Sequence, residues 1–206
     1  MKAVLTIILL FLQITFIQSQ TIHKVVVGSV GNTIAVNLRN TNIEKIEEIR
    51  ARVISKPEWI EMVDEEIFIT EIDRTRTEKL MIRFNISHSV AEAEKGVIQI
   101  EVRDKIGRRW NKEIQILTSL PDHYELKQNY PNPFNPVTKI RFILAKESRV
   151  LLKVSNILGE TVKVLKEEML KAGEYEVEFD GRELSSGIYF YSIEAGDFKS
   201  VKKMLL

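Results

Sequence analysis

The sequence contains no cysteine among its 206 residues. It can therefore form no disulfide bond, and it has no thiolate for catalysis or metal binding. Histidine is almost as scarce: His23, His88 and His123 stand at metal-ligand spacing neither from one another nor from a carboxylate. These absences predict a protein without a metal site or any other cofactor, stabilised by buried apolar side chains alone.

An excess of charge of either sign is also missing. The 30 lysine and arginine residues nearly balance the 29 aspartate and glutamate residues, and the formal net charge is +1. Loss of Lys2 with a leader would bring the net charge to zero. Chains that bind nucleic acid or anionic membrane surfaces carry a basic excess, so we expect no nucleic-acid partner.

Catalytic patterns are missing as well. Ser185-Ser186-Gly187 is not the Gly-x-Ser-x-Gly elbow of a hydrolase, and Gly28-Ser29-Val30-Gly31 lacks the Lys-Ser/Thr of a phosphate-binding loop. Asp64-Glu65-Glu66 lacks the spacing and the glycine of a calcium loop and indicates a solvated turn. Arg108-Arg109-Trp110 could stack on a sugar or an anion, but the side of a hairpin is favoured. We therefore expect no catalytic residues and no enzyme activity.

One long apolar run does occur, at the start of the chain. Lys2 precedes the mostly apolar segment from Ala3 to Ile17, and Ser19 offers a small residue for cleavage close to Gln20. This order is typical of a secretory signal peptide. The alternative is a membrane anchor, but the run is short for a span of about 20 residues. We expect residues 1–20 to be a signal peptide.

Residues 21–118 alternate apolar and polar side chains in short runs that turn residues separate. The runs with this period of two are Thr33 to Leu38, Leu80 to Ile86, Ile98 to Val102, and Ile114 to Ile116. A period of two is the mark of a strand with one wet face. The spacing of three among Ile43, Ile46 and Ile49 is compatible with a short helix, but a strand from Ile49 to Ser55 is favoured. The pattern predicts an antiparallel β-sandwich.

The order of motifs in this part of the chain carries a resemblance. Asn37 to Asn42, then Pro57-Glu58-Trp59-Ile60, then Gly96 to Ile100 are similar to immunoglobulin-like modules appended to secreted glycosidases. The resemblance implies an immunoglobulin-like sandwich over residues 21–118. It implies no particular ligand.

Proline is concentrated in one place, because four of the five prolines lie between Pro121 and Pro136. Each proline fixes φ and lacks an amide donor, so the segment from Tyr130 to Pro136 is predicted to be a stiff, extended strap. A free proline-rich linker is the alternative. The interleaved aromatic and asparagine residues favour a strap that lies along the second domain. We assign residues 119–136 to the linker and strap.

Residues 137–206 again alternate, with about six strands expected in a small sandwich. The expected strands run from Ile140 to Leu144, Val150 to Val154, Thr161 to Leu165, Tyr175 to Phe179, Ile188 to Ile193, and Phe198 to Leu205. Both faces of the segment from Ile188 to Ile193 are apolar or aromatic, which is typical of a strand in the middle of a sheet. The whole chain is thus predicted to be all-β, with two small antiparallel immunoglobulin-like sandwiches.

Several motifs in order make the second half resemble a known family, the A-type C-terminal sorting domain of type IX secretion cargo in the Bacteroidetes group. The resemblance rests on the strap with Thr138, on Asn156-Ile157-Leu158-Gly159, on Ala172-Gly173, on Leu184 to Tyr191, and on Lys202 to Leu205. The implied sorting-motif residues are Asn129, Tyr130, Pro131, Asn132, Pro133, Phe134, Asn135, Pro136, Asn156, Gly159, Gly173, Ser186, Gly187, Tyr189, Lys202 and Lys203.

The resemblance implies a route and partners. The chain would cross the inner membrane by its signal peptide, and the folded C-terminal domain would be recognised by the outer-membrane type IX translocon and processed by a sortase-like enzyme. The protein would end up secreted or at the cell surface. We expect the Lys202-Lys203 pair and the strap around Tyr130 and Phe134 to be exposed for recognition, although the lysines also suit a guarded edge strand.

Two classes of function stay open for residues 21–118. The favoured one is a non-enzymatic binding or structural module, whose ligand would be a surface glycan or a protein. The alternative is an accessory or carbohydrate-binding module of a secreted hydrolase system. That alternative requires Trp59 or Trp110 on a flat exposed face, and a hidden active site would require Glu48, Asp64, Glu71 and Asp73 to converge.

Overall fold

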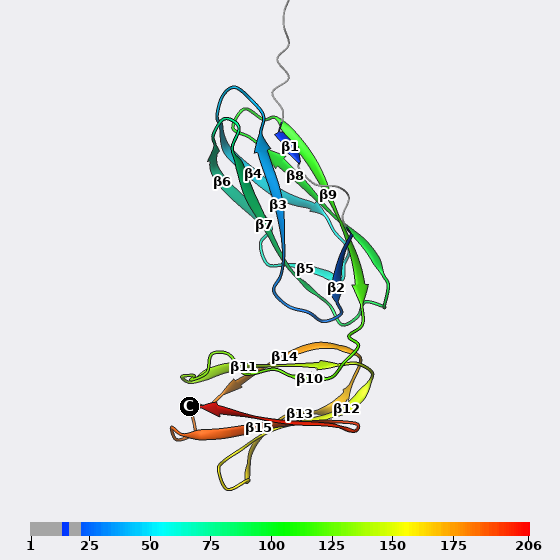
Figure 1. The fold of residues 1–206 in the computed structure, drawn as a ribbon, viewed down its shortest axis with the longest axis vertical. Coiled ribbons are helices and arrows are strands. Elements are labelled where there is room, and N and C mark those ends of the chain that lie inside the picture. Colours follow the sequence, from blue (N-terminus) through cyan, green and yellow to red (C-terminus); the bar gives the residue numbers. More distant parts are fainter. Residues whose placement is uncertain (1–13, 17–21) are drawn as a thin grey trace, which may run out of the picture.

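The structure is a computed structural model that describes residues 14–16 and 22–206 (Figure 1). The described chain consists of strands and loops, which confirms the predicted all-β fold class. Among the described residues, no helix has the length and apolar character needed to cross a bilayer. The predicted signal peptide lies outside the described residues except for β1 (Ile14–Phe16), which pairs antiparallel with a strand of the first domain.

The first domain consists of two facing sheets, a four-stranded sheet in the order β1-β3-β7-β5 and a five-stranded sheet in the order β2-β9-β8-β4-β6. Its strands are β2 (Ile22–Val26), β3 (Asn32–Asn40), β4 (Ile46–Ser55), β5 (Ile60–Met62), β6 (Glu66–Ile72), β7 (Thr77–Ile86), β8 (Lys95–Arg103) and β9 (Arg109–Ser119). The alternating apolar side chains of both sheets meet in one core that includes Leu38, Ile49, Phe84 and Ile100. Sheets packed in this way form a sandwich.

Two details differ from the sequence-based expectations for this domain, and a third decides between two alternatives. β2 pairs parallel with β9, so one pair in a domain expected to be antiparallel runs the other way. The segment around Ile46 and Ile49 is the start of β4, so the favoured strand is confirmed and the helix is wrong. Glu66 begins β6, a strand that the sequence analysis did not identify, while Asp64 and Glu65 lie in the turn before it.

The second domain also has two facing sheets, a three-stranded sheet in the order β10-β11-β14 and a four-stranded sheet in the order β13-β12-β15-β16. Its strands are β10 (Glu125–Leu126), β11 (Val137–Leu144), β12 (Ser148–Ser155), β13 (Thr161–Leu170), β14 (Gly173–Asp180), β15 (Ile188–Ala195) and β16 (Phe198–Leu205). β15 lies inside its sheet between β12 and β16, as its two apolar faces predicted. A separate core contains Phe142, Leu152, Tyr191 and Met204.

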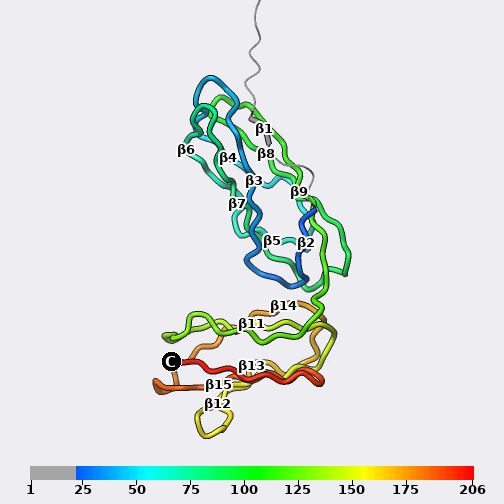
Figure 2. The backbone as a smooth tube through the Cα atoms, in the orientation of Figure 1, coloured from blue at the N-terminus to red at the C-terminus, as the bar shows by residue number. Residues whose placement is uncertain are grey.

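The two domains share no sheet. One end of the first domain meets the β11 and β14 side of the second, whose strands lie across the long axis of the first (Figures 1 and 2). The Glu174 amide donates to the Val27 carbonyl oxygen at 2.9 Å, and His88 Nε2 donates to the Glu174 carbonyl oxygen at 2.8 Å. The His88 ring stacks on Tyr175 with 4.1 Å between centroids. Gly28 has φ 76° and no room for a Cβ atom beside His88, so glycine is required there.

Candidate functional site

The proline-rich strap lies against the second domain, as predicted, and Asn129 fixes its start. Asn129 is buried, and its amide donates to the Tyr191 hydroxyl at 2.8 Å. Its side-chain amide donates to Thr138 Oγ1 at 3.0 Å and to the Pro131 carbonyl oxygen at 3.1 Å. Thr138 donates to the same Pro131 carbonyl oxygen at 2.8 Å. Side chains therefore supply the hydrogen bonds that a proline-rich backbone cannot make for itself.

The middle of the strap holds the end of β16. The Phe134 amide donates to the Leu205 carbonyl oxygen at 2.9 Å, and the Leu205 amide donates to Asn132 Oδ1 at 3.0 Å. Leu206 and Gly187 exchange two backbone hydrogen bonds of 3.0 Å. The peptide bonds before Pro131, Pro133 and Pro136 are cis. Strap and last strand thus form one unit.

The two aromatic residues of the strap have opposite environments. Tyr130 is 81% exposed, and its backbone forms an isolated bridge with Lys139. Phe134 is only 3% exposed and packs against Phe179 with 5.9 Å between centroids. The expectation that Phe134 belongs to an exposed recognition surface is wrong, because its ring fills the core.

The motif from Asn156 to Gly159 forms a turn between β12 and β13. Asn156 Oδ1 accepts hydrogen bonds of 3.0 Å from the amides of Leu158 and Glu160, and Gly159 has φ 80°. This turn holds Ile157 and Leu158 in solvent.

Ser186 and Gly187 lie in the turn before β15. Gly173 begins β14 at the domain contact, where a Cβ atom would approach the Val27 carbonyl oxygen to 3.0 Å. Gly173 therefore takes part in the contact between the domains.

The tyrosines and lysines of the motif separate into core and surface. Tyr189 and Tyr191 are buried and belong to the core of the second domain. Burial raises the pKa of Tyr191 to about 12. Lys202 and Lys203 point to opposite faces because successive residues of a strand alternate. Only Lys203 lies on the outer face of the sheet, opposite Phe190.

That outer face of the four-stranded sheet carries four exposed apolar side chains around Lys203. Phe190 and Ile188 of β15 lie beside Lys203 and Leu205 of β16, and Val201 is 63% exposed one pair further along. We call Ile188, Phe190, Val201 and Leu205 the outer apolar face. Monomeric soluble proteins rarely leave a contiguous apolar patch exposed unless it contacts a partner.

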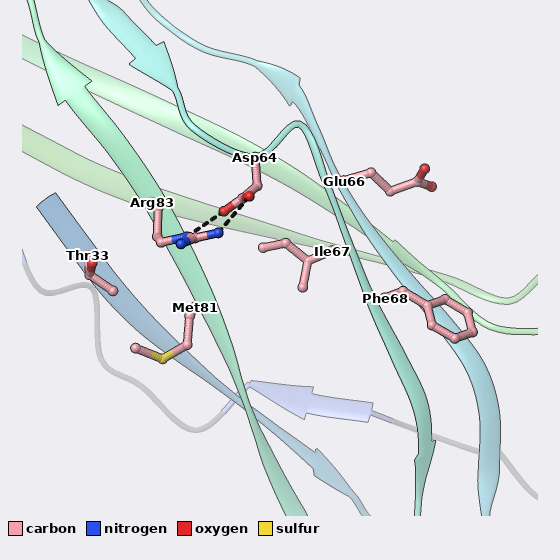
Figure 3. A pocket seen from close by; sticks show the side chains of 7 residues that line it. All are labelled: Thr33, Asp64, Glu66, Ile67, Phe68, Met81 and Arg83. Carbon is pink, nitrogen blue, oxygen red and sulfur yellow. Dashed lines mark hydrogen bonds and ion pairs between the residues drawn. The ribbon is translucent and has the colours of Figure 1, made fainter. Parts of the chain in front are cut away.

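The first domain does not assemble the four acidic residues whose convergence would indicate an active site. Asp64 forms two hydrogen bonds to Arg83, at 2.7 and 2.8 Å, and these hold the pKa of Asp64 below its usual range (Figure 3). Glu71 pairs with Lys45 at 3.2 Å on the other sheet. Within residues 14–16 and 22–206, no cluster of three histidine or acidic side chains could hold a metal ion.

A hollow of about 550 Å³ in the first domain lies beside the Asp64–Arg83 pair and is lined by Ile67, Phe68 and Met81 (Figure 3). Neither tryptophan lies on a flat exposed face. Trp59 and Trp110 are half-buried against the core, and Arg108 lies over the Trp110 ring at 5.6 Å. The hairpin interpretation of residues 108–110 therefore fits better than sugar stacking.

Comparison with known families identifies the second domain. Residues 128–206 match the family model described as "Secretion system C-terminal sorting domain". The C-terminal domain is a type IX secretion sorting domain. A domain of this kind indicates export of the chain to the cell surface or into the medium. The family match covers the strap and every strand from β11 onward.

Solved structures add only distant likenesses. A red sea bream transglutaminase shares 11% identity at a TM-score of 0.37, over 94% of this chain and 31% of that one. The E. coli chaperone DraB shares 13% identity at 0.34, over 95% and 98%. Latent PorU of Porphyromonas gingivalis shares 12% identity at 0.30, over 94% and 20%. The chain thus spans about a third of the transglutaminase, and similarity at these scores supports no argument. No curated protein matches the sequence significantly.

Proposed function

We propose that the type IX machinery binds the sorting domain on the outer apolar face, and that the first domain is a non-enzymatic binding module exported by it. One observation carries the proposal for the face. The second domain closes a complete core of its own, yet it leaves Ile188, Phe190, Val201 and Leu205 in solvent on one sheet. The fold of the domain does not need this apolar surface to be exposed, but a docking partner does.

The strap supports this arrangement indirectly. It fixes β16 through Leu205 and Leu206, and β16 supplies half of the outer apolar face. We therefore describe Asn129, Asn132 and Thr138 as positioning residues for the outer apolar face that the machinery would bind. Tyr130, which is exposed beside β11, lies away from the four-stranded sheet and is not part of this face.

The test is fractionation of cells that express the full chain, a chain ending at residue 128, and the double variant Phe190→Glu and Val201→Glu. We expect both altered chains to be retained inside the cell. A matched control is Val97→Glu with Met81→Glu, because these are exposed apolar residues on sheets of the first domain. If the F190E/V201E chain reached the surface as well as the control, the proposal that the machinery binds the outer apolar face would be refuted. Surface display of the truncated chain would refute the sorting role.

Three features support a first domain that binds rather than catalyses. Asp64 is engaged by Arg83, Glu71 by Lys45, and Glu48 lies 3.5 Å from Lys105. A general acid or base needs a free side chain with a pKa close to the working pH. These carboxylates are paired on separate strands instead, which suits a surface that contacts a ligand without reacting with it.

Sortase-like processing would act between the domains. Asp122 and His123 are exposed in the short connection between β9 and β10, and cleavage there would leave both cores intact. Mass spectrometry of the surface form tests this. A mass that includes residues 128–206 would show that the sorting domain is retained.

A further inference from the structure

The outer face of the five-stranded sheet in the first domain carries a row of arginines. Arg50 on β4 lies opposite Arg103 on β8, and Arg103 lies opposite Arg109 on β9. On the other side of Arg50, the exposed ring of Phe68 on β6 completes the row. Neighbouring strands are about 4.8 Å apart, so three guanidinium groups and one aromatic ring stand in line across four strands.

This row is only partly neutralised within the domain. Glu101 pairs with Arg103 and lies 3.7 Å from Arg109, so one carboxylate serves two cations. Arg50 lies over the Phe68 ring at 6.0 Å. Among the described residues, no carboxylate oxygen lies within ion-pair distance of Arg50 or Arg52. Like charges directly opposite on a sheet destabilise it, so a bound anion would relieve a repulsion that the fold tolerates.

The next row along the same face has a different chemistry. Arg52 lies between Glu66 on β6 and Glu101 on β8, and Asn111 on β9 follows Glu101. A hollow of about 250 Å³ opens between the two rows, with Ile54 at its edge. The carboxylate and amide oxygens of this second row are acceptors for hydroxyl groups, whereas the arginine row binds carboxylates or sulfates in bidentate fashion.

We propose that this face binds an acidic polysaccharide that lies across the strands. The anionic groups of successive sugars would pair with Arg50, Arg103 and Arg109. Hydroxyl groups would donate to Glu66 and Glu101, and the apolar side of a sugar ring would stack on Phe68. The inference rests on the proposed binding role of the first domain and names the class of its ligand.

The same features disfavour other polyanions. A nucleic acid has phosphates at close spacing and would meet Glu66 and Glu101 within the arginine face, and its affinity comes mainly from an unbroken basic surface. An anionic membrane would also need a cluster of apolar side chains that insert, but beside the arginine row this face exposes Phe68 and Ile54, with Val97 further along β8. A glycan with alternating anionic and hydroxyl groups matches both rows.

The experiment measures binding of the protein, purified after expression of the full-length chain, to polygalacturonate by titration calorimetry at low and high salt. We expect binding that weakens with salt. Arg50→Gln combined with Arg103→Gln should weaken it roughly tenfold or more, since two charge-assisted contacts are lost. The control, Arg74→Gln with Arg76→Gln, removes two exposed charges of the same domain away from the face and should leave affinity unchanged.

The inference would be overturned if the unaltered protein did not bind polygalacturonate. It would also be overturned if R50Q/R103Q and the control lost the same affinity for polygalacturonate. Affinity for duplex DNA or for phosphatidylglycerol vesicles equal to that for polygalacturonate would overturn it as well. Misfolding is tested separately. Because Arg50 faces Arg103 and has no carboxylate partner, Arg50→Gln alone should not lower the unfolding temperature, and it should still weaken binding. A failure to bind polygalacturonate is distinct from a failure of the proposed sorting role. Fractionation measures whether the chain reaches the surface, and a chain can do so without binding the polysaccharide.

Discussion

Replacing Tyr191 by phenylalanine removes one hydroxyl group from the centre of the sorting domain. This hydroxyl donates to the Lys127 carbonyl oxygen at 2.9 Å and accepts from the Asn129 amide at 2.8 Å. Tyr191 is fully buried and Asn129 nearly so. The substitution therefore leaves one buried donor, the Asn129 amide, and one half-buried acceptor, the Lys127 carbonyl oxygen, without their partner at the point where the strap begins.

The expected loss follows from these two groups. A buried polar group left without a partner costs about 1–3 kcal/mol. Two fully buried groups would therefore cost roughly 2–6 kcal/mol, and because the Lys127 carbonyl oxygen is half-buried we expect a loss in the lower half of that range in the free energy of unfolding. For a domain of this size, 1 kcal/mol corresponds to about 4–8 °C in the unfolding temperature. Whole domains are stable by only about 5–15 kcal/mol, so Tyr191→Phe should bring the sorting domain close to unfolding.

The assay can separate the two domains without cutting the chain. Both tryptophans, Trp59 and Trp110, lie in the first domain, whereas all five tyrosines lie after residue 123. In a denaturant titration of the full chain, tryptophan fluorescence follows the first domain, and near-ultraviolet circular dichroism from tyrosine follows the second. We expect only the tyrosine transition to move.

The matched control is Tyr189→Phe. The Tyr189 hydroxyl donates to a single acceptor, the Ser185 carbonyl oxygen at 2.8 Å, in a partly buried turn. Its loss should cost less than half as much. A Tyr191→Phe protein no less stable than Tyr189→Phe, or a tryptophan transition that shifts equally, would refute the reasoning about the strap.

Three further predictions concern the same domain and its contact with the first. Phe134→Ala should destabilise the sorting domain by about 3–5 kcal/mol, as for other buried phenylalanines, while Tyr130→Ala should change its stability by less than about 0.5 kcal/mol; denaturant titration measures both. Burial raises the pKa values of Tyr175 and Tyr191 to about 12, so their contribution to stability is complete below about pH 10 and is lost as the pH rises to about 12. An alkaline titration followed by tyrosine dichroism should show this loss, and constant stability up to pH 12 would contradict it. His88→Ala removes the ring that bridges the domains and should speed limited proteolysis of the connection without lowering either unfolding transition; unchanged proteolysis would show that His88 does not couple the domains.

The strands and the sorting domain were predictable because their signals are local. Alternation from Leu80 to Ile86 and from Ile188 to Ile193 follows directly from one buried face per sheet. The turn at Asn156 could be read from side chains that satisfy their own backbone.

Other features depend on pairing between segments that are distant in the sequence, and no local pattern reveals such pairing. β6 was missed because Phe68 and Thr70 face solvent and weaken its alternation. The parallel pairing of β2 depends on where β9 ends. The burial of Phe134 was not predicted because a proline-rich segment has no periodic pattern of apolar residues. Its ring packs against Phe179, which lies 45 positions further along the chain. The arginine row exists only once the registers of β4, β8 and β9 are known.

The hold of the strap on Leu205 and of Gly187 on Leu206 has a consequence for the cell. Both leucines lie in or directly after β16, so the export label is complete only when this strand has joined the strap. A fragment that lacks β16 would keep its first domain but would lack a finished label. Export would then favour chains whose sorting domain has folded over such fragments.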